Sequence, residues 1–144
     1  MLAPKKNEER IKDLVRRPES QTLDFKLHVN NPLKLGKTLS AFANTNGGTL
    51  VVGVSDNKIL VGIDPEEEIF IVEKSAKNYC KPPVKVEFEI LEHDITKDFG
   101  DKEEILILLV HVPKSQFIHY LADENGNMSL YKRLFDRTIP AIEK

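Results

Sequence analysis

The stretch AFANTNGGTLVVGVSDN, residues 41–57, constrains the fold of this chain more than any other segment. It begins in a helical pattern, passes through Asn-Gly-Gly and continues as an apolar run rich in β-branched residues. Gly47 and Gly48 accept the left-handed backbone conformation that ends a helix. An apolar run of this kind is typical of a strand with both faces buried. The stretch therefore predicts a helix that stops at the glycines and a buried strand that begins directly after them.

The same two glycines raise the question of a phosphate-binding loop. In the dinucleotide fingerprint and in the P-loop, glycines connect a strand to the start of a helix, whose N-terminus faces the phosphate. Here the order is helix, glycines, strand, and the C-terminal end of a helix carries partial negative charge that repels phosphate. No Gly-Lys-Ser or Gly-Lys-Thr follows. The order favours a structural turn and disfavours ATP as a ligand at this position.

Periodicity predicts the elements around this segment. Helical spacing and capping residues predict helices over residues 7–17, from Pro32 to Gly47, and from Asp64 to Pro82. Strand patterns occur at 22–27, 49–55, 58–63, 84–91, 105–112 and 128–134. We expect a short terminal segment at 137–141, a polar loop at 94–104 and a frayed start at 1–6. This order predicts an α+β fold in which a mixed, mainly antiparallel sheet packs with two to three helices in a single domain.

Composition narrows the class of protein. The chain has 144 residues, which suits one domain. Its longest apolar run is 105–110, far short of the roughly 20 residues that span a bilayer. The single cysteine, Cys80, excludes an internal disulfide and a cysteine-based zinc site. We therefore expect a cytoplasmic protein that makes no use of a membrane.

Charge is distributed unevenly along the chain, although the net charge is only −2. Residues 1–58 carry ten Lys and Arg residues against six Asp and Glu residues, whereas residues 59–144 carry eleven against seventeen. A local basic face can bind nucleic acid while the total charge is acidic. The alternative is that these charges only solvate the surface. The four histidines have no metal-ligand spacing, and His111 within its apolar strand is interpreted as a packed residue.

Three acidic residues lie near predicted strand ends or on a polar strand face: Glu19, Asp24 and Asp56. If their strands are neighbours, the carboxylates could converge on Mg²⁺ or Mn²⁺, as metal-assisted phosphodiester cleavage requires. Acidic residues are also common in caps and turns, and Asp56-Asn57 is a good hairpin turn without any chemistry. Both interpretations stay open at this point.

Cationic and aromatic residues suggest a second kind of site. Lys26 shares a strand face with Asp24, and Tyr131 lies among Lys132, Arg133 and Arg137 near the C-terminus. An aromatic ring among cations suits phosphate contact combined with stacking on a base or sugar. A solvated strand edge protected by lysine is the alternative.

Several motifs together resemble the Schlafen-type AlbA domain. They are PESQTLDFK, then KTLSAFANTNGGTLVVGVSDNKILVGI, then VHVPKSQFIHYL and LYKRLFDRTIPA, in the order in which that family carries them. The resemblance runs from about Arg16 to Ala141. It divides the chain into an N-terminal helix or extension at residues 1–15 and a Schlafen AlbA-like domain at residues 16–144.

The resemblance implies a domain that binds nucleic acid, often at the head of a transcriptional regulator with further domains behind it. In the ribonucleases of the family, two glutamates and an aspartate cleave RNA with a divalent metal. Matching the motifs carries those roles to Glu19, Asp24 and Asp56, with Asp24 standing where the family usually has Glu.

The leading hypothesis is therefore a nucleic-acid-binding module that contacts the phosphates of DNA or RNA and needs no cofactor. Its expected contacts are Lys26, Lys58, Tyr131, Lys132, Arg133 and Arg137. The first alternative is a ribonuclease dependent on Mg²⁺ or Mn²⁺ that uses the three acidic residues. The second alternative is a protein-interaction or ATP-sensing module, with the strand at 84–90 as a homodimer edge.

Overall fold

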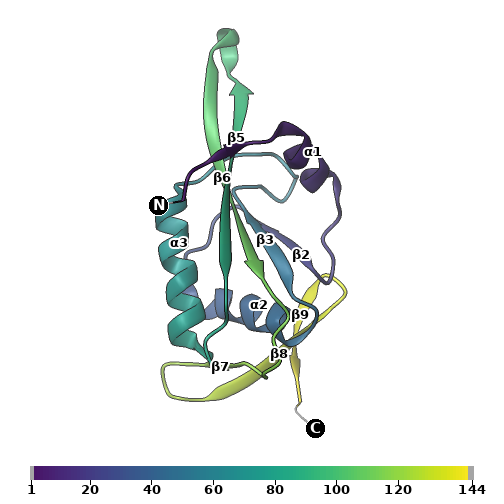
Figure 1. Ribbon diagram of the computed structural model, residues 1–144, viewed down its shortest axis with the longest axis vertical. Helices are drawn as coiled ribbons and strands as arrows, with labels where there is room; N and C mark the ends of the chain where they lie inside the picture. The colour runs from purple at the N-terminus through teal and green to yellow at the C-terminus, as the bar shows by residue number, and fades with distance from the viewer. Residues whose placement is uncertain (1, 143–144) are drawn as a thin grey trace.

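The computed structural model describes residues 2–142. Three helices pack against two sheets (Figure 1). The helices are α1 (Glu8–Arg16), α2 (Pro32–Asn44) and α3 (Pro65–Lys74), the last continuing as a π-helical turn at Ser75–Tyr79. The content confirms the predicted α+β class, with the strands divided between two sheets instead of one.

The larger sheet has five strands in the order β1-β5-β6-β3-β2. Its members are β1 (Lys5–Lys6), β5 (Glu87–Thr96), β6 (Lys102–Val112), β3 (Gly48–Val52) and β2 (Leu23–Lys26). β3 pairs antiparallel with β6 and parallel with β2, so the strand predicted from the glycine motif lies inside the sheet. The smaller sheet has the order β4-β7-β8-β9, formed by β4 (Cys80–Lys81), β7 (Tyr120–Ala122), β8 (Met128–Leu134) and β9 (Arg137–Ala141).

The apolar core divides between the two faces of the larger sheet. On one face Leu39 and Phe42 of α2 pack with alternate residues of β3 and β6, such as Leu50. On the other face Ile11 of α1 packs with the residues in between, such as Val51. Because successive strand residues point to opposite faces, one buried strand serves both cores. Helix α1 is therefore packed into the body and does not lie apart from it.

The turn after α2 forms as the sequence predicts. The backbone N–H of Gly47 donates to the carbonyl of Phe42 at 2.7 Å, and Gly47 has φ +74°. A Cβ at Gly47 would lie 2.7 Å from the carbonyl oxygen of Val112, and one at Gly48 would lie 2.5 Å from the Phe42 ring. The glycines are therefore needed for close packing against other parts of the chain, and their side of the turn is filled by protein.

Asn44 holds the smaller sheet against the end of α2. Its amide nitrogen donates to the carbonyls of His119 and Tyr131, at 2.8 and 3.0 Å, and its amide oxygen accepts from the His119 backbone N–H at 2.8 Å. One side chain thereby satisfies three backbone groups from two strand regions, which would otherwise lack partners in the part-buried interior. The asparagine of the motif thus has a structural role.

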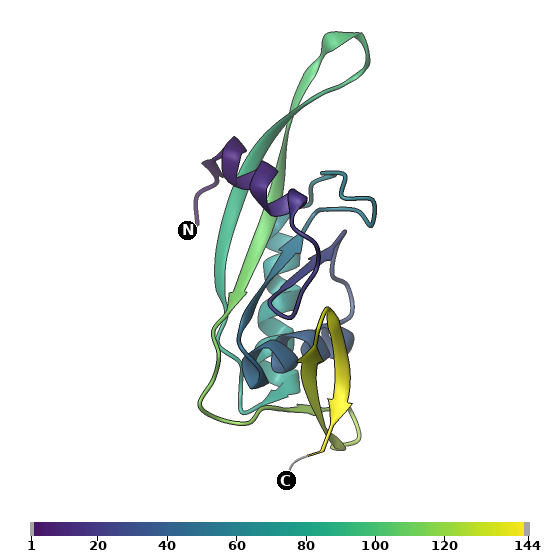
Figure 2. The ribbon, with the colours of Figure 1, turned by 90° about the vertical axis from the view of Figure 1, so that its right-hand side faces the viewer.

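Several segments differ from the sequence expectations, among them β4, which replaces the end of the helix expected from Asp64 to Pro82, and β7, which was not expected. The polar loop expected at 94–104 is mostly strand, since β5 and β6 pair as far as Thr96 and Lys102 and form a hairpin that projects from the body (Figures 1 and 2). The outer part of this hairpin packs on no core, so its charged residues lack the alternation of apolar side chains that predicts a strand. Lys5 and Lys6, expected to fray, pair with β5, whereas Met1 lies outside the described residues. Residues 58–63 return as a loop with a single bridge between Val54 and Leu60, and the positive φ values of Lys58 (+64°) and Gly62 (+92°) depart from strand geometry.

Candidate functional site

A polar hollow of about 580 Å³ opens where β2, α2 and the β8–β9 hairpin meet. Its lining combines cationic, acidic and neutral polar side chains, which are Glu19, Asp24, Lys26, Asn31, Lys34, Lys37, Thr38, Arg133, Asp136 and Thr138, together with Leu33. The chain reaches this hollow from three separate segments, at residues 19–26, 31–38 and 133–138. Four of the residues expected from the sequence to take part in function therefore meet here, namely Glu19, Asp24, Lys26 and Arg133.

Glu19 and Asp24 form a carboxyl pair at the wall of the hollow. Their side chains share a hydrogen bond, and the backbone N–H of Phe25 donates to Glu19 Oε2 and to Asp24 Oδ1, each at 3.1 Å. Asp24 is only 5% exposed, because the polar face of β2 that was expected to meet solvent is covered in the structure. Burial, and secondly the hydrogen bond with Glu19, raise the pKa of Asp24 to about 7.

The proton of the pair therefore belongs mainly to Asp24. The hydrogen bond from Asp24, the largest influence, lowers the pKa of Glu19 below its ordinary value. A carboxyl group that stays protonated near neutral pH donates a hydrogen bond instead of adding a second negative charge. The pair thus presents less negative charge to a ligand than two ordinary carboxylates would.

Arg133 braces the hollow from β8. Its guanidinium is stacked over the Phe42 ring, 4.8 Å from the centroid, and donates to the carbonyls of Ser20 and Gln21 at 2.6 and 3.3 Å. It also donates to Thr138 Oγ1 at 3.1 Å. The residue is 5% exposed, and burial lowers the pKa of its guanidinium. Arg133 is a buried structural cation that adds positive charge to the hollow. Its burial does not fit the direct phosphate contact that the sequence led us to expect.

Three lysines form the cationic rim, which consists of Lys26, Lys34 and Lys37. Lys26 Nζ lies 3.6 Å from Asp24 Oδ2. Lys34 and Lys37 project from α2, and within residues 2–142 neither has an ion-pair partner. Lys37 Nζ lies 5.5 Å from the centroid of the Tyr131 ring, which brings the predicted aromatic residue to the same rim.

Sequence reasoning missed Lys34 and Lys37. The sequence does contain a signal for them. In the segment PLKLGKT the two lysines are three residues apart, so they lie on one side of the helix between residues that are buried. Asn31 caps this helix by accepting from the backbone N–H groups of Leu33 and Lys34, each at 3.1 Å. Lys34 and Lys37 lie on the polar face of α2, away from its apolar stripe.

Asp56 does not complete an acidic triad. It is exposed in the turn that follows Val54, closed by bonds between Ser55 and Lys58, and it does not line the hollow. Within the described range, no three His, Cys, Asp or Glu side chains come together as a group that could hold a metal ion. The structure therefore brings together two of the three predicted metal ligands, and this donor set does not fit the expected Mg²⁺ or Mn²⁺ site.

The other predicted phosphate contacts lie outside the hollow. Lys58 Nζ lies 3.9 Å from the centroid of the Phe25 ring and donates to the Arg17 carbonyl at 2.6 Å. Lys132 projects from the opposite face of β8, because side chains alternate along a strand. Arg137 is exposed at the start of β9.

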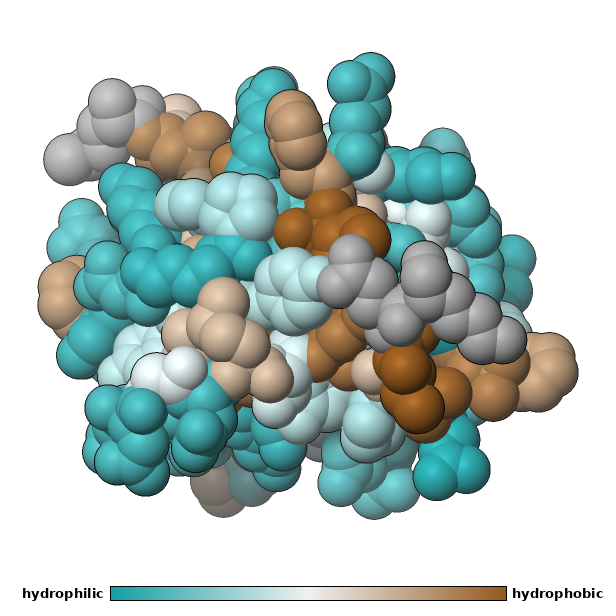
Figure 3. Space-filling view, turned by 90° about the horizontal axis from the view of Figure 1, so that it is seen from below, coloured by the Kyte–Doolittle hydropathy of each residue, from teal (hydrophilic) through white to brown (hydrophobic). Residues whose placement is uncertain are grey.

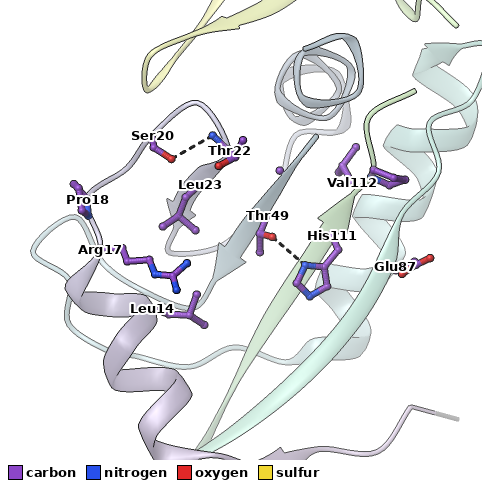
Figure 4. A pocket seen from close by; sticks show the side chains of 12 residues that line it. Leu14, Arg17, Pro18, Ser20, Thr22, Leu23, Thr49, Glu87, His111 and Val112 are labelled. Carbon is purple, nitrogen blue, oxygen red and sulfur yellow. Dashed lines mark hydrogen bonds between the residues drawn. The ribbon is translucent and has the colours of Figure 1, made fainter. Parts of the chain in front are cut away.

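A second hollow, of about 610 Å³, lies between the C-terminal end of α1 and one end of the larger sheet, where strands β2, β3, β5 and β6 begin or end (Figure 4). The ring of His111 bonds at one nitrogen to Thr49 Oγ1, at 2.9 Å, and at the other to Glu89 Oε1, at 2.6 Å. Arg10 of α1 donates to both oxygens of Glu89, at 2.5 and 2.6 Å. Both ring nitrogens are thus bonded to protein groups, but the side chain is 31% exposed and lines this hollow, so His111 is not packed in the apolar core. Through Glu89, the same contacts tie α1 to the sheet.

Fold and hollow together define an α+β domain whose surface site has a cationic rim and a protonated carboxyl pair. The chain matches the family described as Schlafen, AlbA_2 over residues 19–141, and it belongs to that family. The family as a whole is associated with nucleic acid. The search of the curated proteins gives no match.

Among solved structures, the chain is similar to the crystal structure of the DIP2311 protein from Corynebacterium diphtheriae, with a TM-score of 0.56 and 17% sequence identity. The similarity covers 93% of this chain and 26% of that chain, so the present chain spans about a quarter of that protein. At this identity the likeness supports the fold alone. Among residues 2–142, no helix is long and apolar enough to cross a membrane.

Proposed function

We propose that this chain is a nucleic-acid-binding module that contacts phosphates through Lys26, Lys34 and Lys37 around the polar hollow. The observation that carries the proposal is the position of Lys34 and Lys37, which project beside the hollow without ion-pair partners among the described residues. A lysine without a carboxylate partner can neutralise a phosphate and displace the counterions condensed on the nucleic acid, which is the main source of affinity in such complexes. Family membership supports the same class of ligand.

The protonated carboxyl pair supports the proposal further. Because the pKa of Asp24 is raised to about 7, its negative charge is partly suppressed at neutral pH, and the rim is more positive than a count of residues suggests. The buried guanidinium of Arg133 contributes charge without itself needing to reach the ligand. The role of a DNA-binding module in a transcriptional regulator is the form of this function that we propose.

The direct test is fluorescence anisotropy with labelled DNA and RNA oligonucleotides at low salt. Replacing both rim lysines, Lys34→Gln with Lys37→Gln, is expected to weaken binding at least tenfold. The matched control is Lys12→Gln with Lys74→Gln, which removes the same charge from exposed lysines on α1 and α3 that also lack ion-pair partners among the described residues. Equal loss in the two variants would reduce the effect to net charge and contradict a site at the rim.

Metal-dependent RNA cleavage is a second candidate, and the adjoining carboxyls of Glu19 and Asp24 are the observation that favours it. Against it, the donor set lacks a third converging ligand among the described residues. Incubation of the protein with RNA and Mn²⁺ decides the matter, since cleavage that disappears in Glu19→Gln would establish the candidate. Intact RNA under conditions in which the protein binds RNA would dismiss it.

A further inference from the structure

The β8–β9 hairpin has a second face that the polar hollow does not use. Arg133 and its cross-strand partner Thr138 both line the hollow on the α2 side. Side chains alternate along a strand, so the neighbouring pairs Lys132–Ile139 and Leu134–Arg137 project from the opposite face. We call this opposite face the outer face of the hairpin.

The outer face is both cationic and apolar. Lys132 and Arg137 are exposed on it, two residues apart in register, and such diagonal neighbours lie about 7–8 Å apart. Leu134 beside them is 51% exposed. Within residues 2–142, neither of the two cations has an ion-pair partner. Viewed from the end of the molecule that the smaller sheet forms, apolar side chains gather at the surface among polar ones (Figure 3).

Lys132 also borders a hollow of about 440 Å³ whose other wall is the loop before β7. The loop supplies Phe117, which is 69% exposed, and Gln116, while β8 supplies Leu130. Among the residues that line this hollow, which all belong to the described part of the chain, there is no Asp or Glu. The hollow therefore combines one aromatic face, walls of apolar and neutral polar side chains, and a single positive charge.

This combination selects among ligands. A phosphate satisfies the cations, whereas an exposed aromatic face is satisfied by a flat ring that stacks on it. In a duplex the faces of the bases are already stacked on one another, so only an unpaired base can stack on a protein ring. A single-stranded nucleic acid carries accessible flat rings along a chain of phosphates, so one such ligand can reach both cations and the aromatic ring.

We propose that a single-stranded nucleic acid crosses the outer face of the β8–β9 hairpin, with phosphates on Lys132 and Arg137 and a base stacked on Phe117. The inference rests on the proposed function, since it extends the ligand from the rim around the polar hollow to the other face of the same hairpin. It adds a class of ligand, single strands over duplexes, and a residue, Phe117, that the rim does not involve.

The chain itself offers a sharp test, because it contains no tryptophan. Phe117→Trp places a single tryptophan in the loop beside the outer face, and Phe70→Trp places one on α3, where the native Phe70 has a similar exposure of 66%. Saturating oligothymidine is expected to quench the emission of the first variant and to leave that of the second unchanged, since quenching requires a stacked base. Anisotropy with the same labelled oligonucleotide confirms saturation.

Affinity provides the second arm. Phe117→Ala is expected to weaken the binding of oligothymidine about fivefold or more, the effect of losing one base stack, and to leave the binding of a blunt duplex of equal length unchanged. Anisotropy that reports binding, together with an unquenched Phe117→Trp and an unaffected Phe117→Ala, would overturn the inference and leave the proposed function standing. If neither oligonucleotide binds the wild-type protein, both fail. A change in Phe117→Trp emission with protein concentration alone would assign the face to a second copy of the chain and also overturn the inference.

Discussion

Glu19 and Asp24 share a hydrogen bond between their carboxyl groups, and Asp24 is the member that holds the proton as the pH approaches neutral. The pair forms because Asp24 lies on the polar side of β2, where the surrounding chain buries it. A buried carboxylate without sufficient hydrogen bonds is costly, and protonation removes that cost. The consequences concern both stability and binding.

The first prediction is a fall in stability as pH rises. The pKa of Asp24 is raised to about 7 in the folded state, so the folded protein retains a proton that the unfolded chain releases from about pH 4 upward. The free energy of unfolding therefore decreases through the window from about pH 4 to 7 and levels off above it.

In Asp24→Asn this titration is absent while the side chain keeps a donor toward Glu19. Urea denaturation between pH 5 and 8.5 should show the variant gaining on the wild type by on the order of 2–4 kcal/mol as pH rises. The pKa of Glu19 is lowered, so Glu19 stays ionised over this range and does not contribute. Parallel profiles for the two proteins would contradict the buried, protonated state of Asp24.

Arg133 should be far more sensitive to substitution than its neighbours on the hairpin. Arg133→Lys cannot reproduce the donors to the carbonyls of Ser20 and Gln21 or the stacking on Phe42. We expect a loss of about 2–4 kcal/mol in the free energy of unfolding, because a buried charge keeps fewer partners. The matched exposed substitution, Arg137→Lys, should change stability by less than about 0.5 kcal/mol. Similar small effects for both would show that the guanidinium is not buried as described.

Asn44 offers a test of the family motif as structure. Asn44→Ala removes the partners of the His119 N–H and of two carbonyls, those of His119 and Tyr131. The expected cost is about 2–3 kcal/mol, the penalty for leaving part-buried backbone groups unsatisfied. Asn46→Ala, which removes one exposed bond to Gln21, is the control and should cost little. Chemical denaturation measures both, and equal costs would refute the structural role.

The contact between Arg10 and Glu89 predicts that α1 is coupled to the sheet. The pKa of Glu89 is lowered to about 2, mainly by its hydrogen bond with Arg10 and further by its hydrogen bond with His111. Because the pair is partly exposed, the coupling energy from a double-mutant cycle of Arg10→Ala and Glu89→Ala should be modest, about 1 kcal/mol, and smaller at high salt. Zero coupling would show that the Arg10–Glu89 pair does not help to hold α1 on the sheet.

Local chemistry predicted much of this fold. The stop at Gly47 and the helix start at Asp64, whose side chain accepts from the Glu66 N–H at 3.1 Å, both follow from residue type and position. Strand β3 follows from its apolar run. These features depend on residues that are neighbours in the sequence, so they can be predicted from the sequence alone.

The rest depends on contacts between distant segments. Nothing in the segment YKRL indicates that Arg133 is buried on a phenylalanine ring while Lys132 meets solvent, since strand register decides this. The burial of Asp24 depends on the segments of the chain that pack over it. Two of the rim lysines lie on α2, where the apolar residues at helical spacing are the clearest feature of the sequence. The projecting part of the β5–β6 hairpin packs on no core, so its sequence shows no alternation of apolar and polar residues.

The central claim, that the rim lysines release counterions when the protein binds a nucleic acid, is tested most directly by the dependence of affinity on salt. Titration of labelled oligothymidine against wild-type protein and against the variant Lys34→Gln with Lys37→Gln gives the slope of log K against log salt for each. The account predicts that the variant's slope is smaller in magnitude by about 1.4, the value for two lost phosphate contacts on a single strand. Identical slopes for the two proteins would contradict it.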